Sequence, residues 1–200
     1  MEVREVEFRF KGAREYIHGT DMFNTMLPVH SSSTLANIHF TVHEFVYTPK
    51  CRLYRASSRE ELENVEDVRA RCQFDEKGVT HCLVLAQGSG NAASGERYEY
   101  DEERLIALCS MEGDVITLRH RSTFTFIENV VAMNKHLHQQ LFPNAMGKWV
   151  FTRIDLERGC NEREKLALRL RHNLQYRLTK SDILVDGRKV GDLFFSLMKP

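Results

Sequence analysis

The stretch VEFRFKGAREYIHGTDMFNTML, residues 6–27, has a counterpart later in the chain, ITLRHRSTFTFIENVVAMNKHL, residues 116–137. The second stretch begins 110 residues after the first (116 − 6), and the two align without a gap. Several aligned positions are conservative, which predicts that one segment was copied within the chain. Identical residues occupy the following aligned positions: Arg9/Arg119, Ile17/Ile127, Asn24/Asn134 and Leu27/Leu137.

Two shorter blocks follow in the same order at an offset of 111 residues (151 − 40 and 185 − 74). FTVHEF (40–45) aligns with FTRIDL (151–156), and FDEKGVTHCLVL (74–85) aligns with VDGRKVGDLFFS (185–196). Chance alone explains any one block, but blocks in the same order at nearly the same spacing favour an internal duplication. The alternative is two unrelated halves that share only the periodicity of strands and helices.

The duplication predicts how the chain is divided. Residues 1–90 form the first repeat, residues 91–113 form a connecting segment, and residues 114–200 form the second repeat. The small residues at 87–95 are typical of a linker or loop. Their GSGNAASG run does not match a phosphate-binding loop, because no Lys-Ser or Lys-Thr pair follows it.

Each repeat begins with a strand of alternating apolar residues, continues through a loop into a helix and ends in antiparallel strands. In the second repeat, the apolar spacing predicts a helix over 127–142 that Pro143 ends. In the first repeat, Thr20 or Asp21 is expected to cap a shorter helix that ends before Pro28. Hairpins are expected to turn at Glu76-Lys77-Gly78 and at Asp186-Gly187.

The composition excludes several classes of protein. Lys plus Arg equals Asp plus Glu at 28 each, so no net charge attracts the chain to nucleic acid. The charged N-terminal residues do not resemble a secretory signal, and no apolar run is long enough for a membrane span. The odd number of cysteines, with no CxxC pair, indicates reduced thiols, most simply small buried residues, in a cytoplasmic protein.

The order of elements is that of an α+β unit, in which a helix buries its apolar side on one face of a sheet. The strand–loop–helix blocks 6–27 and 116–142, together with the hairpins 72–86 and 183–198, resemble the hotdog superfamily. The resemblance implies two tandem hotdog-like units, each a long helix packed on a curved antiparallel sheet, which form an intrachain pseudo-dimer. It is a resemblance of architecture. The dehydratase pattern of a His followed by Pro-Gly is absent, and HGTDMFN is only loosely similar to the Asp-before-helix pattern of thioesterases.

The resemblance also implies a function. Hotdog proteins mostly process acyl thioesters of coenzyme A or acyl carrier protein, so an enzyme of lipid or polyketide biosynthesis is expected. Thioesterase-type hydrolysis and dehydration of a 3-hydroxyacyl chain both remain open. The alternative is a non-catalytic member that binds an acyl group or a carrier protein, or a structural partner in a biosynthetic complex. No cofactor is expected, and a homodimer of pseudo-dimers is compatible with the resemblance.

The alignment of the repeats also predicts candidate catalytic residues. His18 aligns with Glu128, and the next residue, Gly19, aligns with Asn129, all at the entry to a helix. Histidine transfers protons near neutral pH, and Glu128 or Asp21 is a candidate to orient it or to activate water. Asn129 is a candidate to polarise a carbonyl group. The alternative interpretation is that Asp21 and Asn129 cap helices and that His18 is a solvated loop residue.

Two further groups of residues carry weaker predictions. Arg163, Arg169 and Arg171 lie in a charged run that is most simply a solvated sheet face, but they are also candidates to bind the phosphates of coenzyme A or of a carrier-protein arm. His39 and His43 lie four residues apart on a predicted strand. Because a strand rises about 3.3 Å per residue, they are roughly 13 Å apart, too far to bind one metal ion.

Overall fold

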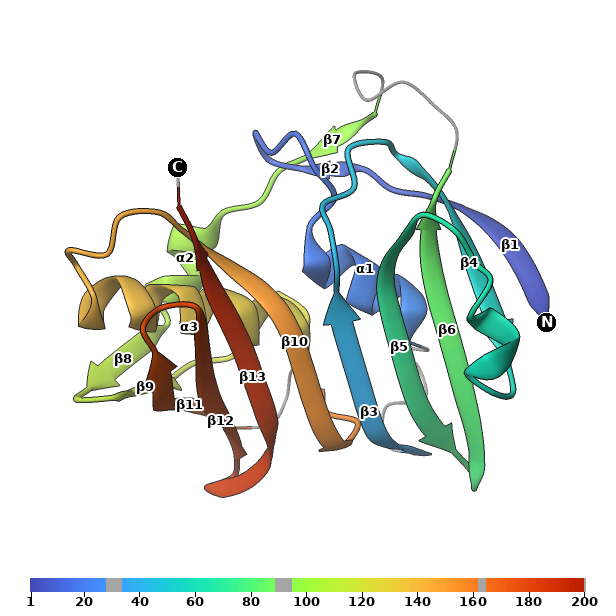
Figure 1. The fold of residues 1–200 in the computed structure, drawn as a ribbon. Helices are drawn as coiled ribbons and strands as arrows, with labels where there is room; N and C mark the ends of the chain where they lie inside the picture. The colour runs from blue at the N-terminus through green and yellow to red at the C-terminus, as the bar shows by residue number, and fades with distance from the viewer. Residues whose placement is uncertain (28–33, 89–94, 162–164, 200) are drawn as a thin grey trace. The chain divides into compact units, whose positions relative to one another are not determined.

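The structure is a computed structural model that describes residues 1–27, 34–88, 95–161 and 165–199. The chain divides into two compact units, Met1–Tyr100 and Asp101–Pro200. Both units consist mainly of antiparallel strands (Figure 1). No helix among the described residues is long and apolar enough to cross a membrane.

The first unit contains one antiparallel sheet with the strand order β1-β4-β6-β5-β3 (Figure 1). A short parallel pair, β2 with β7, lies outside this sheet. The elements of the unit in chain order are β1 (Glu2–Glu7), β2 (Phe10–Lys11), α1 (Gly19–Met26), β3 (Leu35–Val42), β4 (Lys50–Ala56), the 3-10 helix η2 (Glu60–Leu62), β5 (Val68–Glu76), β6 (Val79–Gln87) and β7 (Arg97–Tyr98).

Helix α1 packs on one face of this sheet, against β5 and β6. The ring of Phe23 on α1 meets the ring of Phe40 on β3 edge-on, at 5.3 Å between centroids. Because side chains alternate along a strand, the same face also carries the buried Phe74 and Leu85. The apolar core of the first unit therefore lies between α1 and the sheet.

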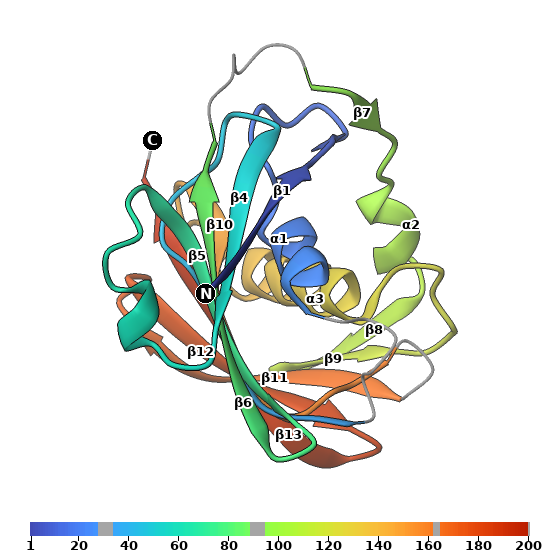
Figure 2. The same ribbon diagram turned by 90° about the vertical axis from the view of Figure 1, so that its right-hand side faces the viewer.

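The second unit contains an antiparallel sheet with the strand order β10-β13-β12-β11-β9-β8. Helix α3 lies over β9 and β11 and also contacts β10 (Figure 2). The elements in chain order are α2 (Glu102–Ile106), β8 (Cys109–Glu112), β9 (Val115–Leu118), α3 (Phe126–Leu141), β10 (Lys148–Arg158), β11 (Leu166–Leu174), β12 (Leu178–Val185) and β13 (Arg188–Met198).

The start and the buried side of α3 follow from its sequence. Thr125 and Glu128 form a capping box, in which each side chain bonds the backbone N–H of the other. Ile127, Val130 and Leu137 are completely buried. Phe142 has left the helical conformation, one residue before Pro143. The sequence therefore predicted this helix to within a residue at each end.

Both predicted hairpin turns are confirmed. Lys77 and Gly78 have φ of 51° and 78° between β5 and β6, and Asp186 and Gly187 have φ of 50° and 79° between β12 and β13. Two successive residues with positive φ make the turn whose twist matches that of antiparallel strands. Gly, and to a lesser degree Asp, tolerates this conformation.

The expected α+β architecture needs correction. The described chain is mainly antiparallel sheet, and α1 has only 8 residues against the 16 of α3. A long helix in each of two tandem units is therefore not what the structure contains. Leu27 adopts an extended conformation (φ −102°, ψ 137°) because the residue before a proline, here Pro28, is disfavoured in the helical region.

Candidate functional site

The candidate site lies at the N-terminus of α1, where the chain leaves the sheet. The backbone N–H of Ile17 donates to the carbonyl of Val46 at 2.8 Å, which fixes the approach to the helix. His18 is extended (φ −75°, ψ 142°), and its carbonyl accepts from the N–H groups of Asp21 and Met22. The first N–H groups of a helix have no acceptor within it and lie at the positive end of its dipole. Those groups here belong to Gly19 and Thr20.

A completely buried lysine lies beside this helix end. Lys11, on β2, places Nζ 3.1 Å from Oδ1 of Asp21 and donates to Oγ1 of Thr20 at 2.9 Å. The ammonium also lies 4.4 Å from the centroid of the Tyr100 ring and 5.7 Å from that of Tyr98. A buried charge is tolerated only where it is paired and hydrogen-bonded, and this environment provides both conditions.

Asp21 is held from two sides. Its Oδ1 atom accepts from the Tyr98 hydroxyl at 2.8 Å as well as from Lys11. Only 14% of its side chain is exposed, and it lies in the first turn of α1, where a negative charge is favoured. The carboxylate is therefore an anchor for the lysine and the tyrosine.

The hydroxyl of Thr20 connects the ion pair to His18. Nδ1 of the half-buried His18 lies 2.8 Å from Oγ1 of Thr20, the same atom that accepts from Lys11. The ring is thus oriented from its Nδ1 side. Proton transfer at the other nitrogen, Nε2, is the chemistry that this orientation permits.

The predicted residues of the second unit are arranged differently. Oε2 of Glu128 accepts from the backbone N–H and the hydroxyl of Thr125, both at 2.9 Å. Nδ2 of Asn129 donates to the carbonyl of Phe124 at 3.3 Å. Both side chains therefore take part in the start of α3, which was the alternative interpretation for Asn129.

Two of the three candidate arginines lie among the described residues. Arg163 lies outside the described residues, and Arg169 is exposed on β11. Nε of Arg171 lies 2.7 Å from Oδ2 of Asp182, whose other oxygen is 2.8 Å from Nζ of Lys189. A phosphate at Arg171 would compete with this carboxylate.

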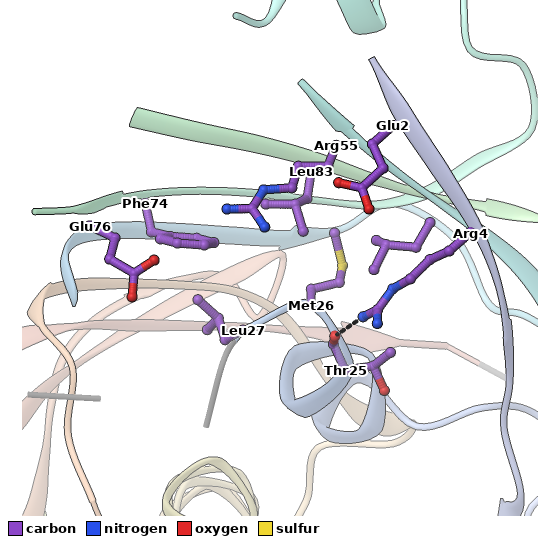
Figure 3. Close-up of a pocket in the computed structure, with 10 residues that line it drawn as sticks. Glu2, Arg4, Thr25, Met26, Leu27, Arg55, Phe74, Glu76 and Leu83 are labelled. Atoms are coloured by element: carbon purple, nitrogen blue, oxygen red, sulfur yellow. Dashed lines mark hydrogen bonds between the residues drawn. The ribbon is translucent and has the colours of Figure 1, made fainter. Parts of the chain in front are cut away.

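A pocket of about 390 Å³ opens at the other end of α1 (Figure 3). Its apolar part comes from the last turn of the helix and from the sheet face beneath it. Its charged groups include Arg4, which donates to the carbonyl of Thr25 at 3.4 Å. The lining residues are Glu2, Arg4, Thr25, Met26, Leu27, Leu53, Arg55, Phe74, Glu76 and Leu83.

The first unit leaves room for this pocket because α1 is short. In the second unit the last turns of α3 cover the sheet. In these turns Nε2 of His138 is hydrogen-bonded to Oγ1 of Thr179 on β12, and the two atoms are 2.6 Å apart. Helix α1 ends at Met26, after 8 residues, whereas α3 has 16 residues. The pocket volume is within the range of about 300–1,000 Å³ that small-molecule sites occupy.

Comparisons with known proteins give matches only in three dimensions. No protein-family model matches the chain, and no curated protein matches its sequence. A protein from Thermobifida fusca with a provisional thioesterase II assignment matches at a TM-score of 0.52 and 9% identity, over 100% of this chain and 93% of that chain. The chain has a hotdog-like fold.

Two other solved structures with hotdog-like folds align less closely. A protein from Novosphingobium aromaticivorans with a provisional thioesterase assignment matches at a TM-score of 0.47 and 11% identity, over 99% of this chain and 94% of that chain. The dehydratase domain of PpsC from Mycobacterium tuberculosis, solved with C12:1-CoA, matches at a TM-score of 0.46 and 9% identity. The match covers 98% of this chain and 93% of that chain. Identities this low describe the fold and leave the activity to be argued from the site.

Within this hotdog-like fold, the buried Cys51 and Cys72 and the half-buried Cys109 are poor nucleophiles. Burial raises the pKa of Cys51 and of Cys109 to about 11, and it also raises the pKa of Cys72. The thiolate, which is the reactive form, is therefore disfavoured. Among the described residues, no group of three or more His, Cys, Asp or Glu side chains is arranged to hold a metal ion.

Sequence reasoning identified His18 and Asp21 but missed the residues that connect them. Lys11 directly follows Phe10 in an alternating stretch, so the pattern places it on the solvent side of a strand. Tyr98 lies 77 residues from Asp21, and no local signal relates the two. Thr20 was expected only as a helix cap. The one usable signal was a lysine ten residues before an aspartate in the same repeat, which is weak on its own.

Proposed function

We propose that this protein processes acyl thioesters and that its reaction is thioester hydrolysis. The observation that supports this is the connected set Lys11, Thr20 and His18, which orients an imidazole at a helix N-terminus. The fold is that of a protein with a provisional thioesterase assignment, and this likeness agrees with the proposal by analogy. All five cysteines are free thiols, which fits a reducing compartment such as the cytoplasm.

In the proposed reaction, the N–H groups of Gly19 and Thr20 donate to the carbonyl oxygen of the thioester. His18 takes a proton from water at Nε2, and the water oxygen attacks the carbonyl carbon. The negative charge that develops on the carbonyl oxygen is stabilised by the two N–H groups and by the helix dipole. The C–S bond then breaks, and His18 returns its proton to the leaving sulfur. The products are a carboxylic acid and a thiol.

The buried ion pair has a positioning role in this proposal. Oγ1 of Thr20 has two lone pairs, so it can accept from Lys11 and from Nδ1–H of His18 together. This pairing makes Nε2 the basic nitrogen of the ring. Asp21 and Tyr98 fix Lys11 and therefore act on His18 only through it.

The pocket at the end of α1 is proposed to receive the apolar part of the acyl chain. An eight-residue helix is about 12 Å long, which is comparable to a medium-length acyl chain. The buried Leu53, Phe74 and Leu83 provide apolar surface there. The thiol part of the substrate, coenzyme A or the arm of an acyl carrier protein, would remain outside this pocket. No cofactor takes part in the proposed reaction.

Binding without turnover is the second candidate function. The observation that favours it is the complete burial of Lys11, because a buried ion pair can equally serve to hold a binding surface in shape. Dehydration of a 3-hydroxyacyl thioester is the other reaction open to the same residues. In it, His18 would take the Cα proton and return it to the leaving hydroxyl group.

The experiment compares acyl thioesters of coenzyme A and of acyl carrier protein with graded chain lengths. Release of free thiol is followed by absorbance, and formation of an enoyl product by mass spectrometry. His18→Gln is expected to lower kcat at least 100-fold, and the exposed His172→Gln is expected to have no effect. Thermal-shift binding without either product would support the binding role, and an enoyl product would support dehydration. Full activity of His18→Gln would refute the site.

A further inference from the structure

A second pocket of the first unit, about 190 Å³, lies on the sheet face opposite α1. Phe40 on β3 faces α1, so its neighbours His39 and Thr41 point to the other side. The strand register continues this face across the sheet. His39 pairs with Gln73 and Gln73 with Cys82, while Thr41 pairs with Arg71 and Arg71 with Val84. These two rows form the base of the pocket.

The 3-10 helix η2 forms one wall of the pocket. Its buried Leu62 packs on Ala56, Cys82 and Val84, so the helix is attached to the sheet by an apolar contact. Arg59 immediately precedes η2 and lines the pocket from this wall. His43, the residue after β3, also lines the pocket. The pocket therefore has a base of mixed polar and apolar side chains, and residues of three separate segments line it.

The pocket carries two permanent positive charges. Arg59 and Arg71 line it together with His39 and His43, and no Asp or Glu among the described residues lines it. Arg59 and Arg71 have no ion-pair partner within residues 1–27, 34–88, 95–161 and 165–199, whereas the neighbouring Arg69 is paired with Glu44. Glu60, beside Arg59, has its carboxylate bonded to its own backbone N–H and to Ser58, which lowers its pKa.

The titration of His43 agrees with this charge distribution. Its pKa is lowered first by burial and then by the positive charges of Arg71 and Arg59. The guanidinium groups of Arg59 and Arg71, which belong to different segments, therefore both lie close enough to His43 to act on it electrostatically. Arginine pairs act together on phosphate, because each guanidinium presents a planar fork of donors that matches two oxygens.

We propose that this pocket binds a phosphate group, held by Arg59 and Arg71. Its volume is below that of sites for drug-sized ligands, so one phosphate group fits it better than a whole nucleotide. The group is either free phosphate or a phosphate carried by a larger soluble molecule. This site is separate from the proposed thioester site, since it lies on the opposite face of the sheet.

The test is isothermal titration calorimetry of the full chain in a phosphate-free buffer. Inorganic phosphate, pyrophosphate and adenosine 3′,5′-bisphosphate are the probes. Arg71→Gln and Arg59→Gln are each expected to weaken binding at least tenfold. Arg188→Gln, which changes an exposed arginine of the second unit, is the matched control and is expected to keep the wild-type affinity. Melting temperatures of all three variants establish that they are folded.

The relative affinities of the probes distinguish free phosphate from a phosphate carried by a larger molecule. Tighter binding of the bisphosphate than of inorganic phosphate assigns the pocket to a phosphate on a larger molecule, and equal affinities assign it to the free anion. Increasing salt should weaken binding in both cases. Absence of binding by all three probes overturns the proposal, as does equal loss of affinity in the Arg188→Gln control.

Discussion

Lys11 and Asp21 form an ion pair in which the lysine is completely buried and the two charged atoms are 3.1 Å apart. The pair connects the short strand β2 to the first turn of α1, and Tyr98 on β7 completes it through Oδ1 of Asp21. Three segments of the first unit therefore meet at one carboxylate. The side chain of Lys11 is not exposed to solvent, so the stability of its charge depends on its protein partners.

The first prediction concerns the energy of this pair. Lys11→Met is expected to lower the free energy of unfolding by about 3 kcal/mol, because removing one partner leaves a buried carboxylate without its counter-charge. Asp21→Asn should cost a similar amount. The double variant should recover part of the loss, since neither charge then remains unpaired. Urea unfolding of the four proteins completes the double-mutant cycle. Additive losses would show that the two residues do not interact.

The second prediction concerns pH and His138 in the second unit. His138 is completely buried, and the centroid of its ring lies 4.5 Å from that of Trp149. The ring also stacks on Phe195, with 5.6 Å between the centroids. Burial lowers its pKa from 6.5 to about 4, against an opposing effect of its bond to the Asn134 carbonyl. The folded protein therefore binds this proton less readily than the unfolded chain. Stability from the neutral ring is complete above about pH 6.5 and is lost progressively as the pH falls to about 4.

The full shift corresponds to roughly 3 kcal/mol of unfolding free energy. Urea unfolding at a series of pH values should show this loss in the wild type. His138→Gln removes the titrating group, so its stability should change less between pH 6.5 and 4, although it starts lower. The exposed His172→Gln should retain the wild-type pH dependence. Identical pH profiles for the wild type and His138→Gln would contradict the assignment.

The sequence predicted the parts of the fold that depend on local physics. The hairpin turns followed from Gly78 and Gly187, and the long helix followed from its apolar spacing and Pro143. Pro28 also predicted that α1 ends early. The error came from the family resemblance, which implied a long helix in each of two units, whereas α1 has only 8 residues.

The candidate site was only half predictable for a different reason. His18 and Asp21 lie within three residues of each other, so a local pattern identified both. Lys11 and Tyr98 reach the site through the parallel pairing of β2 with β7, which joins segments more than eighty residues apart. Their partners are set by tertiary structure, and periodicity gives no information about it. For Glu128 the sequence did hold a signal, because Thr125 and Glu128 have the Thr-x-x-Glu spacing of a capping box.

The third prediction separates helix capping from catalysis in the second unit. Thr125→Ala removes the hydroxyl that accepts from the Glu128 N–H, and it is expected to cost about 1 kcal/mol of stability. Glu128→Ala should cost a similar amount, because it removes the reciprocal bond. Neither change should alter kcat once both proteins are shown to be folded under assay conditions. A large fall in kcat for Glu128→Ala alone would assign that carboxylate a catalytic role.

The fourth prediction concerns a buried hydroxyl. Ser181, on β12, is completely buried, and its Oγ has no hydrogen-bond partner among the described residues. An unsatisfied buried polar group lowers stability relative to an apolar group of the same size. Ser181→Ala is therefore expected to leave the free energy of unfolding unchanged or to raise it by up to about 1 kcal/mol. A loss of more than about 1 kcal/mol would show that the hydroxyl has a partner in solution.

The last prediction tests the pocket at the end of α1 as the site of the acyl chain. Thr25 lines this pocket and is half-buried, so Thr25→Phe should fill part of the space without disturbing the buried core of the helix. Hydrolysis of long-chain thioesters is expected to fall at least tenfold, whereas that of acetyl thioesters should remain unchanged, because the short chain does not reach the pocket. The conservative Thr25→Ser keeps the pocket open and should keep the wild-type chain-length profile. If Thr25→Phe slowed all chain lengths equally, the acyl chain would lie elsewhere, while the assignment of His18 would be unaffected.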